Sequence, residues 1–326
     1  MNFLIASSID PATIQTLCEK HDVICAFGAS QEELKALIED RHVLIFRSGV
    51  DINSDVMRCS SGLKALIRAG SGIDNVDLEY VHQHGLKFYR IPEPGAKAVA
   101  EMTFAHFLAL SRNLLQADRL WRQGKWVKHQ LSGFLLTGKT LGVIGVGNIG
   151  SLVGQMGSAW GMKVLGYDKD IGSARAAELW DQYRIRLTDF DEVLANADYI
   201  SLHVPLDDST RYMFDKDVFS RMKRGGFLVN IARGGVVDEK ALYRALTEDQ
   251  ILKGAALDVH EKEGEGNISP LADLPNVILS PHIGSQTIDS QREIGERVLN
   301  IVEELASNEI IERKREADTT TARITS

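Results

Sequence analysis

The fold of this chain is decided by residues 140–168, which read TLGVIGVGNIGSLVGQMGSAWGMKVLGYD. An apolar run at 141–144 predicts a buried parallel strand, a helical pattern follows at 148–160, and a second apolar run at 164–167 ends on Asp168. Glycines in G-x-G-x-x-G spacing separate the first strand from the helix. This order of strand, glycine turn, helix, strand and carboxylate is the one that a dinucleotide-binding βαβ unit requires.

Each glycine of this turn has a separate physical task. Gly145 permits the tight turn, Gly147 lets a pyrophosphate approach the backbone, and Gly150 lets the helix pack closely on the strand. The N-terminus of the helix then offers unpaired N–H groups and a positive dipole end to the phosphates. Glycine-rich turns also serve plain packing, but the agreement of the flanking strand, helix and acid favours a dinucleotide site.

Asp168 predicts which dinucleotide is bound. A carboxylate at this strand end accepts hydrogen bonds from the adenosine ribose hydroxyls and repels a 2′-phosphate. Like charges about 4 Å apart cost on the order of 1 kcal/mol in water and about 4 kcal/mol at a partly buried site. We therefore expect NAD rather than NADP as the cofactor.

Composition limits the remaining possibilities. A length of 326 residues allows two domains, and 44% hydrophobic with 25% charged residues is ordinary for a globular protein. The net charge of −8 disfavours a nucleic-acid-binding surface. The cysteines, Cys18, Cys25 and Cys59, lack C-x-x-C or metal-ligand spacing and are expected to be reduced thiols. Without a signal-peptide pattern or an apolar stretch of about 20 residues, the sequence predicts a soluble cytoplasmic protein with no metal.

Residues 1–95 alternate short apolar runs with helical patterns, which is typical of a parallel sheet covered on both faces. Ser30 and Glu33 form a capping box, and Asn75 is expected to cap a helix that ends at His84. This first unit lacks a glycine fingerprint. Its strands are predicted at 3–6, 23–26, 43–46, 65–68 and 87–89.

The rest of the chain begins with one long helix, predicted between Pro94 and Trp126, whose apolar stripe suits a link between two domains. A second strand–helix unit then runs from Thr140 to about Pro281. The polar, charged tail at 313–326 is expected to be disordered. The later strands of the second unit are predicted at 199–204, 227–231, 255–259 and 277–279.

Reactive side chains follow the ends of three predicted strands, where open α/β sheets bind their ligands. Arg233 precedes two glycines that leave a guanidinium unhindered to grip a carboxylate. An acidic segment with Glu261 and Glu263 follows another strand, and His282 follows a third beside Pro281. Each residue alone is more often a surface or structural group. Together, downstream of a dinucleotide turn, they indicate a reaction centre.

Further motifs accompany the glycine turn, and with it they resemble the D-isomer-specific 2-hydroxyacid dehydrogenase family, most of all its phosphoglycerate dehydrogenase-type members in the short form without a regulatory domain. The resemblance covers about residues 40–305. It implies two doubly wound parallel-sheet α/β domains: a Rossmann NAD-binding domain at 97–283, inserted in a discontinuous flavodoxin-like substrate domain at 1–96 and 284–312. The motifs are RAGSGIDNVD at 68–77, VAE at 99–101, GKTLG at 138–142, HVPL at 203–206, NIARGGVVD at 230–238, AALDV at 255–259 and PHIG at 281–284.

The resemblance implies a role for each site residue. Arg233 would hold the substrate carboxylate and carbonyl, His282 would be the acid/base, and Glu263 would keep His282 protonated for reduction. A protonated histidine both donates the proton and stabilises the developing oxyanion. The implied substrate contacts are Arg47, Ser48, Ser71, Gly72, Arg233 and His282. The implied cofactor contacts are Ser71, Gly145, Gly147, Asn148, Ile149, Gly150, Asp168, His203, Val204, Pro205, Thr210, Ile231, Ala232, Asp258, His282 and Gly284.

The sequence also departs from the family pattern. Gly264 stands where members usually have a proline after the catalytic glutamate, in a long Glu-Gly-Glu-Gly-Asn loop, and this leaves Glu261 as an alternative to Glu263.

The resemblance further implies a homodimer through residues 99–126, with Lys128 presented to the neighbour's active site. Alternative functions are a glyoxylate/hydroxypyruvate reductase, a phosphite dehydrogenase or, from another class, an NAD-sensing corepressor-like binding protein. The complete Arg/Glu/His set disfavours the corepressor.

Overall fold

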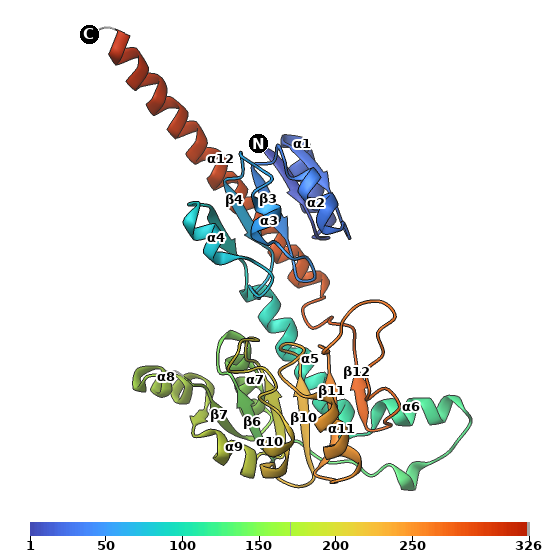
Figure 1. Cartoon of the computed structure of the whole chain (residues 1–326). Coiled ribbons are helices and arrows are strands. Elements are labelled where there is room, and N and C mark those ends of the chain that lie inside the picture. The colour runs from blue at the N-terminus through green and yellow to red at the C-terminus, as the bar shows by residue number, and fades with distance from the viewer. Residues whose placement is uncertain (170, 325–326) are drawn as a thin grey trace. The chain divides into compact units, whose positions relative to one another are not determined.

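The computed structural model describes the backbone of residues 1–169 and 171–324 and the side chains of residues 1–169 and 171–307. The chain divides into two compact α/β units (Figure 1). Unit 1 comprises Met1–Gly95 with Gln286–Ser326, and unit 2 comprises Ala96–Ser285. No helix in the described ranges is both long and apolar enough to cross a membrane.

Unit 1 is built from ten elements: β1 Asn2–Ile5, α1 Pro11–Lys20, β2 Asp22–Cys25, α2 Gln31–Leu37, β3 Val43–Phe46, α3 Ser54–Met57, β4 Ala65–Arg68, α4 Leu78–Gln83, β5 Lys87–Arg90 and α12 Ile288–Ile324. Its strands form a five-stranded parallel sheet of order β2-β1-β3-β4-β5. In β1, Phe3 and Ile5 pack in one hydrophobic cluster and Leu4 in another. Because side chains alternate across a sheet, both faces are covered, and this explains the uninterrupted apolar runs of the sequence.

Helix caps in unit 1 confirm one prediction and correct another. At α2, Ser30 Oγ accepts the Glu33 N–H (3.3 Å) while the Glu33 carboxylate accepts the Ser30 N–H (2.8 Å), as the capping box requires. The cap of α4 is Asp77, which accepts the Tyr80 N–H at 2.9 Å, so the prediction of Asn75 is wrong. The Asn75 side chain has stronger tertiary partners, because it donates to the backbone carbonyls of Arg47 and Val50.

Helix α12 completes unit 1. Ile294, Val298 and Val302 pack in the same cluster as Phe3 and Ile5. The backbone remains helical to Ile324, where the sequence predicts a disordered tail. Residues 311–317 (IERKREA) contain mostly strong helix formers, and this local propensity accounts for the continuation despite the polar composition. The last two residues of the predicted tail, 325 and 326, lie outside the described residues.

Unit 2 contains α5 Glu93–Ser111 (from its fourth residue), α6 Leu114–Arg122, the 3-10 turn Lys128–Gln130, β6 Thr140–Ile144, α7 Asn148–Ala159, β7 Lys163–Tyr167, α8 Ser173–Tyr183, β8 Ile185–Leu187, α9 Phe190–Asn196, β9 Tyr199–Leu202, α10 Lys216–Arg221, β10 Gly226–Asn230, α11 Glu239–Thr247, β11 Leu252–Leu257 and β12 Val277–Leu279. These strands form a seven-stranded parallel sheet of order β12-β11-β10-β9-β6-β7-β8. The chain therefore leaves β6 for β7 and β8 on one side, then returns to β9 on the other side.

Such a reversal is the point at which open α/β sheets bind ligands, because the loops after the two central strands diverge. Here those strands are β6 and β9, which pair in parallel with Ile144 opposite Leu202. The His203 N–H donates to the Ile144 carbonyl at 2.7 Å, so the segment after β9 starts beside the glycine turn. Together with unit 1, this topology confirms the predicted doubly wound α/β class.

The prediction of one continuous helix from Pro94 to Trp126 is wrong. Asn113 has a left-handed backbone (φ 51°), which ends α5 and separates it from α6. Phe104 and Phe107 of α5 are buried with the unit 2 core, whereas none of the residues in α6, all of them described, is buried. The apolar stripe of the sequence thus belongs to two helices with different surroundings.

Candidate active site

The glycine turn between β6 and α7 has the geometry of a phosphate-binding turn. Gly145 has φ +89°, and a Cβ there would lie 2.7 Å from the His203 carbonyl oxygen. A Cβ on Gly150 would lie 1.9 Å from the Gly145 carbonyl oxygen, so only glycine allows α7 to begin this close to β6. Around Gly147, in contrast, no atom of the described residues lies within 4 Å of an added Cβ, and Gly147 and Asn148 are exposed.

The first turn of α7 is therefore open at the residue where a pyrophosphate would approach. Gly147 caps this helix without a side-chain hydrogen bond, which leaves the N–H groups of Asn148 and Ile149 available to an anion. Asp168 stands directly after β7, and its Oδ2 accepts the Val146 N–H at 3.0 Å. The second carboxylate oxygen remains for a ribose hydroxyl, so these residues fit NAD.

The segment after β9 supplies the other predicted cofactor residues, His203, Val204, Pro205 and Thr210. Thr210 is buried, and its hydroxyl donates to the Pro205 carbonyl at 2.7 Å and accepts the Asp207 N–H at 2.8 Å. Thr210 thus shapes the loop that carries Pro205. His203 Nε2 lies 2.6 Å from Ser201 Oγ, whereas its Nδ1 is buried without a partner among the described residues. Burial lowers the pKa of His203 to about 3, so its ring is neutral.

Arg233 lies in a turn after β10, and the side chain of Asn230 holds the backbone of this turn. The buried Asn230 accepts the Ala232 N–H with Oδ1 (3.0 Å) and donates Nδ2 to the Arg233 carbonyl (3.0 Å). Gly234 has a sharper task than leaving the guanidinium unhindered, because a Cβ there would lie 1.8 Å from the His260 carbonyl oxygen. Ile231 and Ala232, both predicted cofactor contacts, are buried in the same turn. The arginine turn therefore packs against the segment that leads to Glu263.

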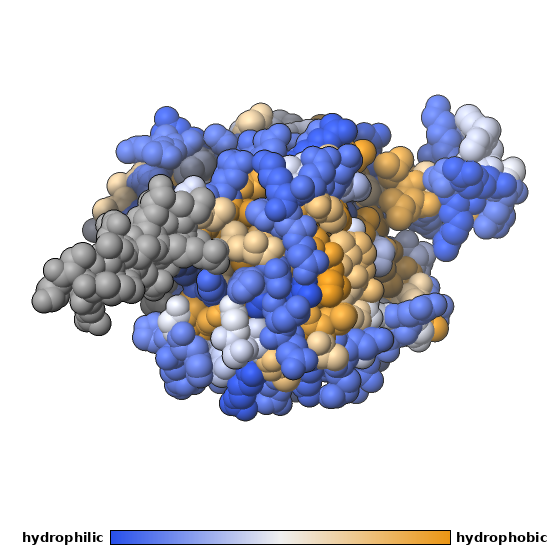
Figure 2. All heavy atoms as spheres, turned by 90° about the horizontal axis from the view of Figure 1, so that it is seen from above, coloured by the Kyte–Doolittle hydropathy of each residue, from blue (hydrophilic) through white to orange (hydrophobic). Residues whose placement is uncertain are grey.

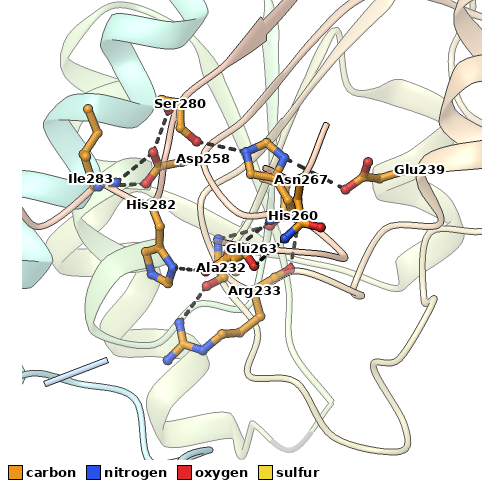
Figure 3. Close-up of polar contacts among 12 residues, drawn as sticks. Ala232, Arg233, Glu239, Asp258, His260, Glu263, Asn267, Ser280, His282 and Ile283 are labelled. Carbon is orange, nitrogen blue, oxygen red and sulfur yellow. Dashed lines mark hydrogen bonds and ion pairs between the residues drawn. The ribbon is translucent and has the colours of Figure 1, made fainter. Parts of the chain in front are cut away.

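His282 and Glu263 form the central pair of the site (Figure 3). His282 Nδ1 lies 2.8 Å from Glu263 Oε2, with side-chain exposures of 34% and 41%. Burial opposes ionisation of Glu263, but the hydrogen bond and charge of His282, with the His260 N–H, lower the pKa of Glu263 below its ordinary value. With Nδ1 engaged, Nε2 is the ring nitrogen left to exchange a proton with a substrate.

The alternative glutamate is placed elsewhere. Glu261 accepts the Glu239 N–H at 2.9 Å, and its own N–H donates to Glu239 Oε1 at 2.8 Å. The long loop at 264–268 thus leaves Glu263, rather than Glu261, in contact with His282.

Asp258 organises the loop that carries His282. Its side chain is fully buried at the end of β11. Oδ1 accepts Ser280 Oγ–H (2.6 Å) and the Ile283 N–H (3.0 Å), and Oδ2 accepts the Gly284 N–H (2.7 Å). His282 itself has φ +55°, a conformation that is uncommon for a non-glycine residue. Both carboxylate oxygens of Asp258 hold this loop in place, a structural task that the prediction of a cofactor contact does not include.

Unit 1 carries the predicted substrate residues Arg47, Ser48, Ser71 and Gly72. Ser48 and Ser71 are exposed on the loops after β3 and β4, and the Arg68 Nε donates to the Gly72 carbonyl at 2.8 Å. Arg47 is 9% exposed, and its Nη1 donates to the uncharged Gln286 Oε1 at 3.3 Å. Burial lowers the pKa of the Arg47 guanidinium.

Sequence reasoning missed four residues that support the site: Asn75, Asn230, Glu239 and His260. Each acts through hydrogen bonds to backbone groups that are distant in sequence or hidden in a turn. The sequence did contain a signal for them. Asn75 and Asn230 lie inside the motifs RAGSGIDNVD and NIARGGVVD, while Glu239 directly follows VVD and His260 directly follows AALDV. Polar residues in or next to buried segments need hydrogen-bond partners.

A doubly wound unit with a glycine turn, a strand-end carboxylate and a histidine–glutamate pair defines a dinucleotide-binding protein with an acid–base centre. The family model for the NAD-binding domain of the D-isomer specific 2-hydroxyacid dehydrogenases matches residues 104–284. The chain belongs to this family, as predicted from the motifs.

Among its relatives, D-3-phosphoglycerate dehydrogenase of Methanocaldococcus jannaschii is 38% identical over 316 residues, which are 96% of this chain and 59% of that protein. Hydroxypyruvate reductase of Thermotoga maritima is 36% identical over 301 residues, 91% of this chain and 96% of that protein. The chain spans 47% of the similar chloroplastic D-3-phosphoglycerate dehydrogenase 2 of Arabidopsis thaliana. Many of its curated relatives are thus longer than the part that matches.

Solved structures agree with the fold. D-lactate dehydrogenase from Aquifex aeolicus, complexed with NAD and lactic acid, has a TM-score of 0.81 and 30% identity, covering 95% of this chain and 96% of that one. A glyoxylate reductase from Paecilomyes thermophila has a TM-score of 0.80 and 28% identity, covering 92% and 93%.

Proposed function

We propose that this chain is an NAD-dependent oxidoreductase that transfers a hydride between nicotinamide and C2 of a D-2-hydroxy acid or 2-keto acid. The observation that carries the proposal is the 2.8 Å contact between His282 Nδ1 and Glu263 Oε2, in the unit that matches the family's NAD-binding domain. A binding protein has no need of a paired acid–base group, so this contact favours an enzyme over a corepressor-like module.

Each residue of the pair and of the arginine turn has a task in this reaction. When bound, the nicotinamide supplies or accepts the hydride. Arg233 anchors the substrate carboxylate with a planar, permanently charged guanidinium. During reduction, His282 donates a proton to the carbonyl oxygen as that oxygen gains negative charge, and in oxidation it takes the proton back. Glu263 stabilises the protonated imidazole and so raises the fraction of enzyme that is ready to reduce.

The preferred substrate is proposed to be a 2-keto acid with a second anionic group, as in the phosphoglycerate dehydrogenases. Arg47 supports this proposal, because its side chain is nearly buried and donates a hydrogen bond to Gln286, which is uncharged. It lines a cavity of about 500 Å³ within unit 1, together with Ser8, Asp10 and Gln291. No ion pair joins Arg47 to Asp10 or to another carboxylate among the described residues, and a buried guanidinium is costly unless an anion binds there. Glyoxylate and hydroxypyruvate each carry one carboxylate and no second anionic group for Arg47 to bind.

A screen with purified protein tests the function. Pyruvate, glyoxylate, hydroxypyruvate and 3-phosphohydroxypyruvate are each offered with NADH and with NADPH, and cofactor absorbance is followed. We expect turnover with NADH, highest kcat/KM for the phosphorylated acid, and a narrower NADH preference in Asp168→Ala. Failure with every acid would contradict the dehydrogenase, and NAD reduction by phosphite would support the phosphite alternative instead.

The assembly is proposed to be a homodimer formed through the α6 region of unit 2. Leu114, Leu115, Trp121, Trp126 and Leu135 are all more than half exposed, between 51% and 74%. Figure 2 shows hydrophobic residues among hydrophilic ones on one face of the molecule. Exposed aromatic and leucine side chains in such number are typical of an interface. We also propose a cytoplasmic location, which suits the three exposed free cysteines.

A further inference from the structure

A second buried carboxylate lies behind the catalytic pair. Glu239 is the first residue of α11 and is 4% exposed, although it is surrounded by an exposed loop. Its Oε1 accepts the Glu261 N–H at 2.8 Å, and its Oε2 accepts the Ser269 hydroxyl at 2.7 Å. Its backbone N–H donates to Glu261 Oε1 at 2.9 Å. A buried carboxylate needs such partners, and here all of them come from one loop.

That loop is the one that carries Glu263. Residues 261–268 are all exposed, and Gly264 (φ +108°) and Gly266 (φ +83°) have backbone conformations that favour glycine. Within the loop, Asn267 Nδ2 donates to the Glu263 carbonyl at 3.0 Å. A glycine-containing exposed segment loses much conformational entropy when ordered, so its fixed ends determine where its centre lies. Glu239 fixes one end at Glu261 and the other end at Ser269.

A second connection runs from the loop through His260 to Ser280, two residues before His282 (Figure 3). The His260 N–H donates to Glu263 Oε1 at 3.2 Å, and His260 Nε2 lies 2.9 Å from the Ser280 carbonyl oxygen. His260 Nδ1 is 3.9 Å from Glu239 Oε1, which is too long for a hydrogen bond but close for a charge contact. His260 thus bridges the strand end before Glu263 and the strand end before His282, with Glu239 on its other side.

We propose that Glu239 is a positioning residue for the reaction: by holding both ends of the 261–269 loop, it keeps the Glu263 carboxylate against His282. The inference rests on the proposed function, since it concerns the same proton donor. A carboxylate–imidazole contact weakens as the distance between the groups grows, so a loosened loop stabilises the protonated imidazole less. The result is a loss of reductive activity at high pH before any loss at low pH.

Other charged groups face the pair and are part of the same balance. Figure 3 shows Arg233 after β10, Asp258 at the end of β11 and His260 around the pair, and Lys262 and Glu265 line the same cavity as Glu263 and His282. Of these groups, His260 lies 3.9 Å from Glu239, and this contact loses the carboxylate charge in both Glu239→Ala and Glu239→Gln. A shift of the pH profile in Glu239→Ala that is missing from Glu239→Gln therefore reports the position of Glu263.

The test compares Glu239→Ala with Glu239→Gln, measuring reductive kcat/KM from pH 5.5 to 9. The alanine removes both acceptor oxygens. We expect the reductive kcat/KM of Glu239→Ala to fall at a pH about 0.5 unit or more below that of wild type. Glutamine keeps one oxygen for the Glu261 N–H, and the Ser269 hydroxyl can accept from its amide, so Glu239→Gln should stay near wild type. Ser269→Ala, which loosens one end only, should shift the profile less than Glu239→Ala.

Two reference variants separate positioning from folding. Asp238→Ala removes the N-cap of α11, whose Oδ1 accepts the Lys240 and Ala241 N–H groups, without touching the loop. It should lower Tm while leaving the pH profile in place. Glu263→Gln should shift the profile by itself, and adding Glu239→Ala to it should produce no further shift, because the charge being positioned is gone.

The outcomes are distinct. An unshifted Glu239→Ala profile, an equal shift in Glu239→Gln, or additive shifts in the double variant would each overturn the inference. If Glu239→Ala does not fold, Ser269→Ala decides by the same criterion. If wild type turns over no 2-keto acid, the proposed function fails, whereas wild-type turnover with a profile that only Glu263→Gln moves rejects the positioning role alone.

Discussion

At the scale of single residues, the proposed proton donor, His282, depends on a partner that another strand end supplies. His282 follows β12 and Glu263 follows β11, and their side chains meet at 2.8 Å. The lowered pKa of Glu263 favours the ionised carboxylate in the folded protein. In the proposed reaction, the negative charge of Glu263 lies beside the imidazole to which it is hydrogen-bonded.

Replacing Glu263 by glutamine tests this dependence. The uncharged amide no longer favours protonated His282, so reductive kcat/KM should begin to fall at a lower pH than in wild type, by about one pH unit. Glu261→Gln is the matched control, because Glu261 contacts the Glu239 backbone and not His282. A shift in Glu261→Gln together with an unmoved Glu263→Gln would show that the wrong glutamate has been assigned.

His203 makes folding stability depend on pH. Its folded pKa of about 3 lies below the ordinary 6.5, so the unfolded chain binds the extra proton between these values and stability falls as pH falls through that window. At about 1.4 kcal/mol per pH unit, wild type should lose on the order of 2 kcal/mol between pH 6.5 and 5 through this residue. His203→Gln should remove that part of the slope in urea unfolding at both pH values. Equal slopes in wild type and variant would contradict the buried neutral ring.

At the scale of elements, the sequence predicted what local pattern determines. The apolar runs identified most strands to within one or two residues, and the glycine turn identified α7. The prediction missed the break between α5 and α6 at Asn113, because an asparagine with a left-handed backbone leaves no gap in the apolar stripe of the sequence. It missed β8 as well, where only three residues pair with β7.

For the site, too, the sequence predicts what a local motif determines and misses what depends on contacts between loops. Arg233, Glu263 and His282 could be proposed from the sequence because motifs place them after strand ends. The hydrogen bonds of Glu239 and Asp258 were not found, since they depend on which loops meet in space. A pattern along the chain does not contain that information.

Two glycines of the turn before α7 should respond differently to alanine. Gly150→Ala forces a methyl group to within 1.9 Å of a backbone oxygen, so we expect loss of more than about 2 kcal/mol of stability and loss of NAD binding. In Gly147→Ala the new methyl group meets no atom within 4 Å in the part of the chain that the structure describes, so Tm should stay the same. NAD binding should weaken about tenfold or more, because the methyl group blocks the pyrophosphate. Thermal unfolding and NAD titration measure both. Unchanged NAD affinity in Gly147→Ala would place the phosphates elsewhere.

At the scale of the whole molecule, exposed apolar side chains predict association. Figure 1 shows α6 and the segment after it extending from the sheet of unit 2. Trp121 and Trp126 at this position are 60% and 74% exposed and contact each other edge to face. Light scattering at micromolar concentration should give twice the chain mass of 36.0 kDa, and Trp121→Ser with Trp126→Ser should reduce it to one chain. A monomeric wild type would refute the dimer.

The central claim is that His282 is the proton donor of an NAD-dependent 2-keto acid reduction. The most direct measurement is NADH oxidation by wild type and His282→Ala with the best acid of the screen, together with the NADH dissociation constant of each. Proton donation and oxyanion stabilisation are lost together, so kcat should fall about a hundredfold or more while NADH affinity stays within about threefold. A His282→Ala enzyme that turns over at the wild-type rate with intact NADH binding would contradict the claim.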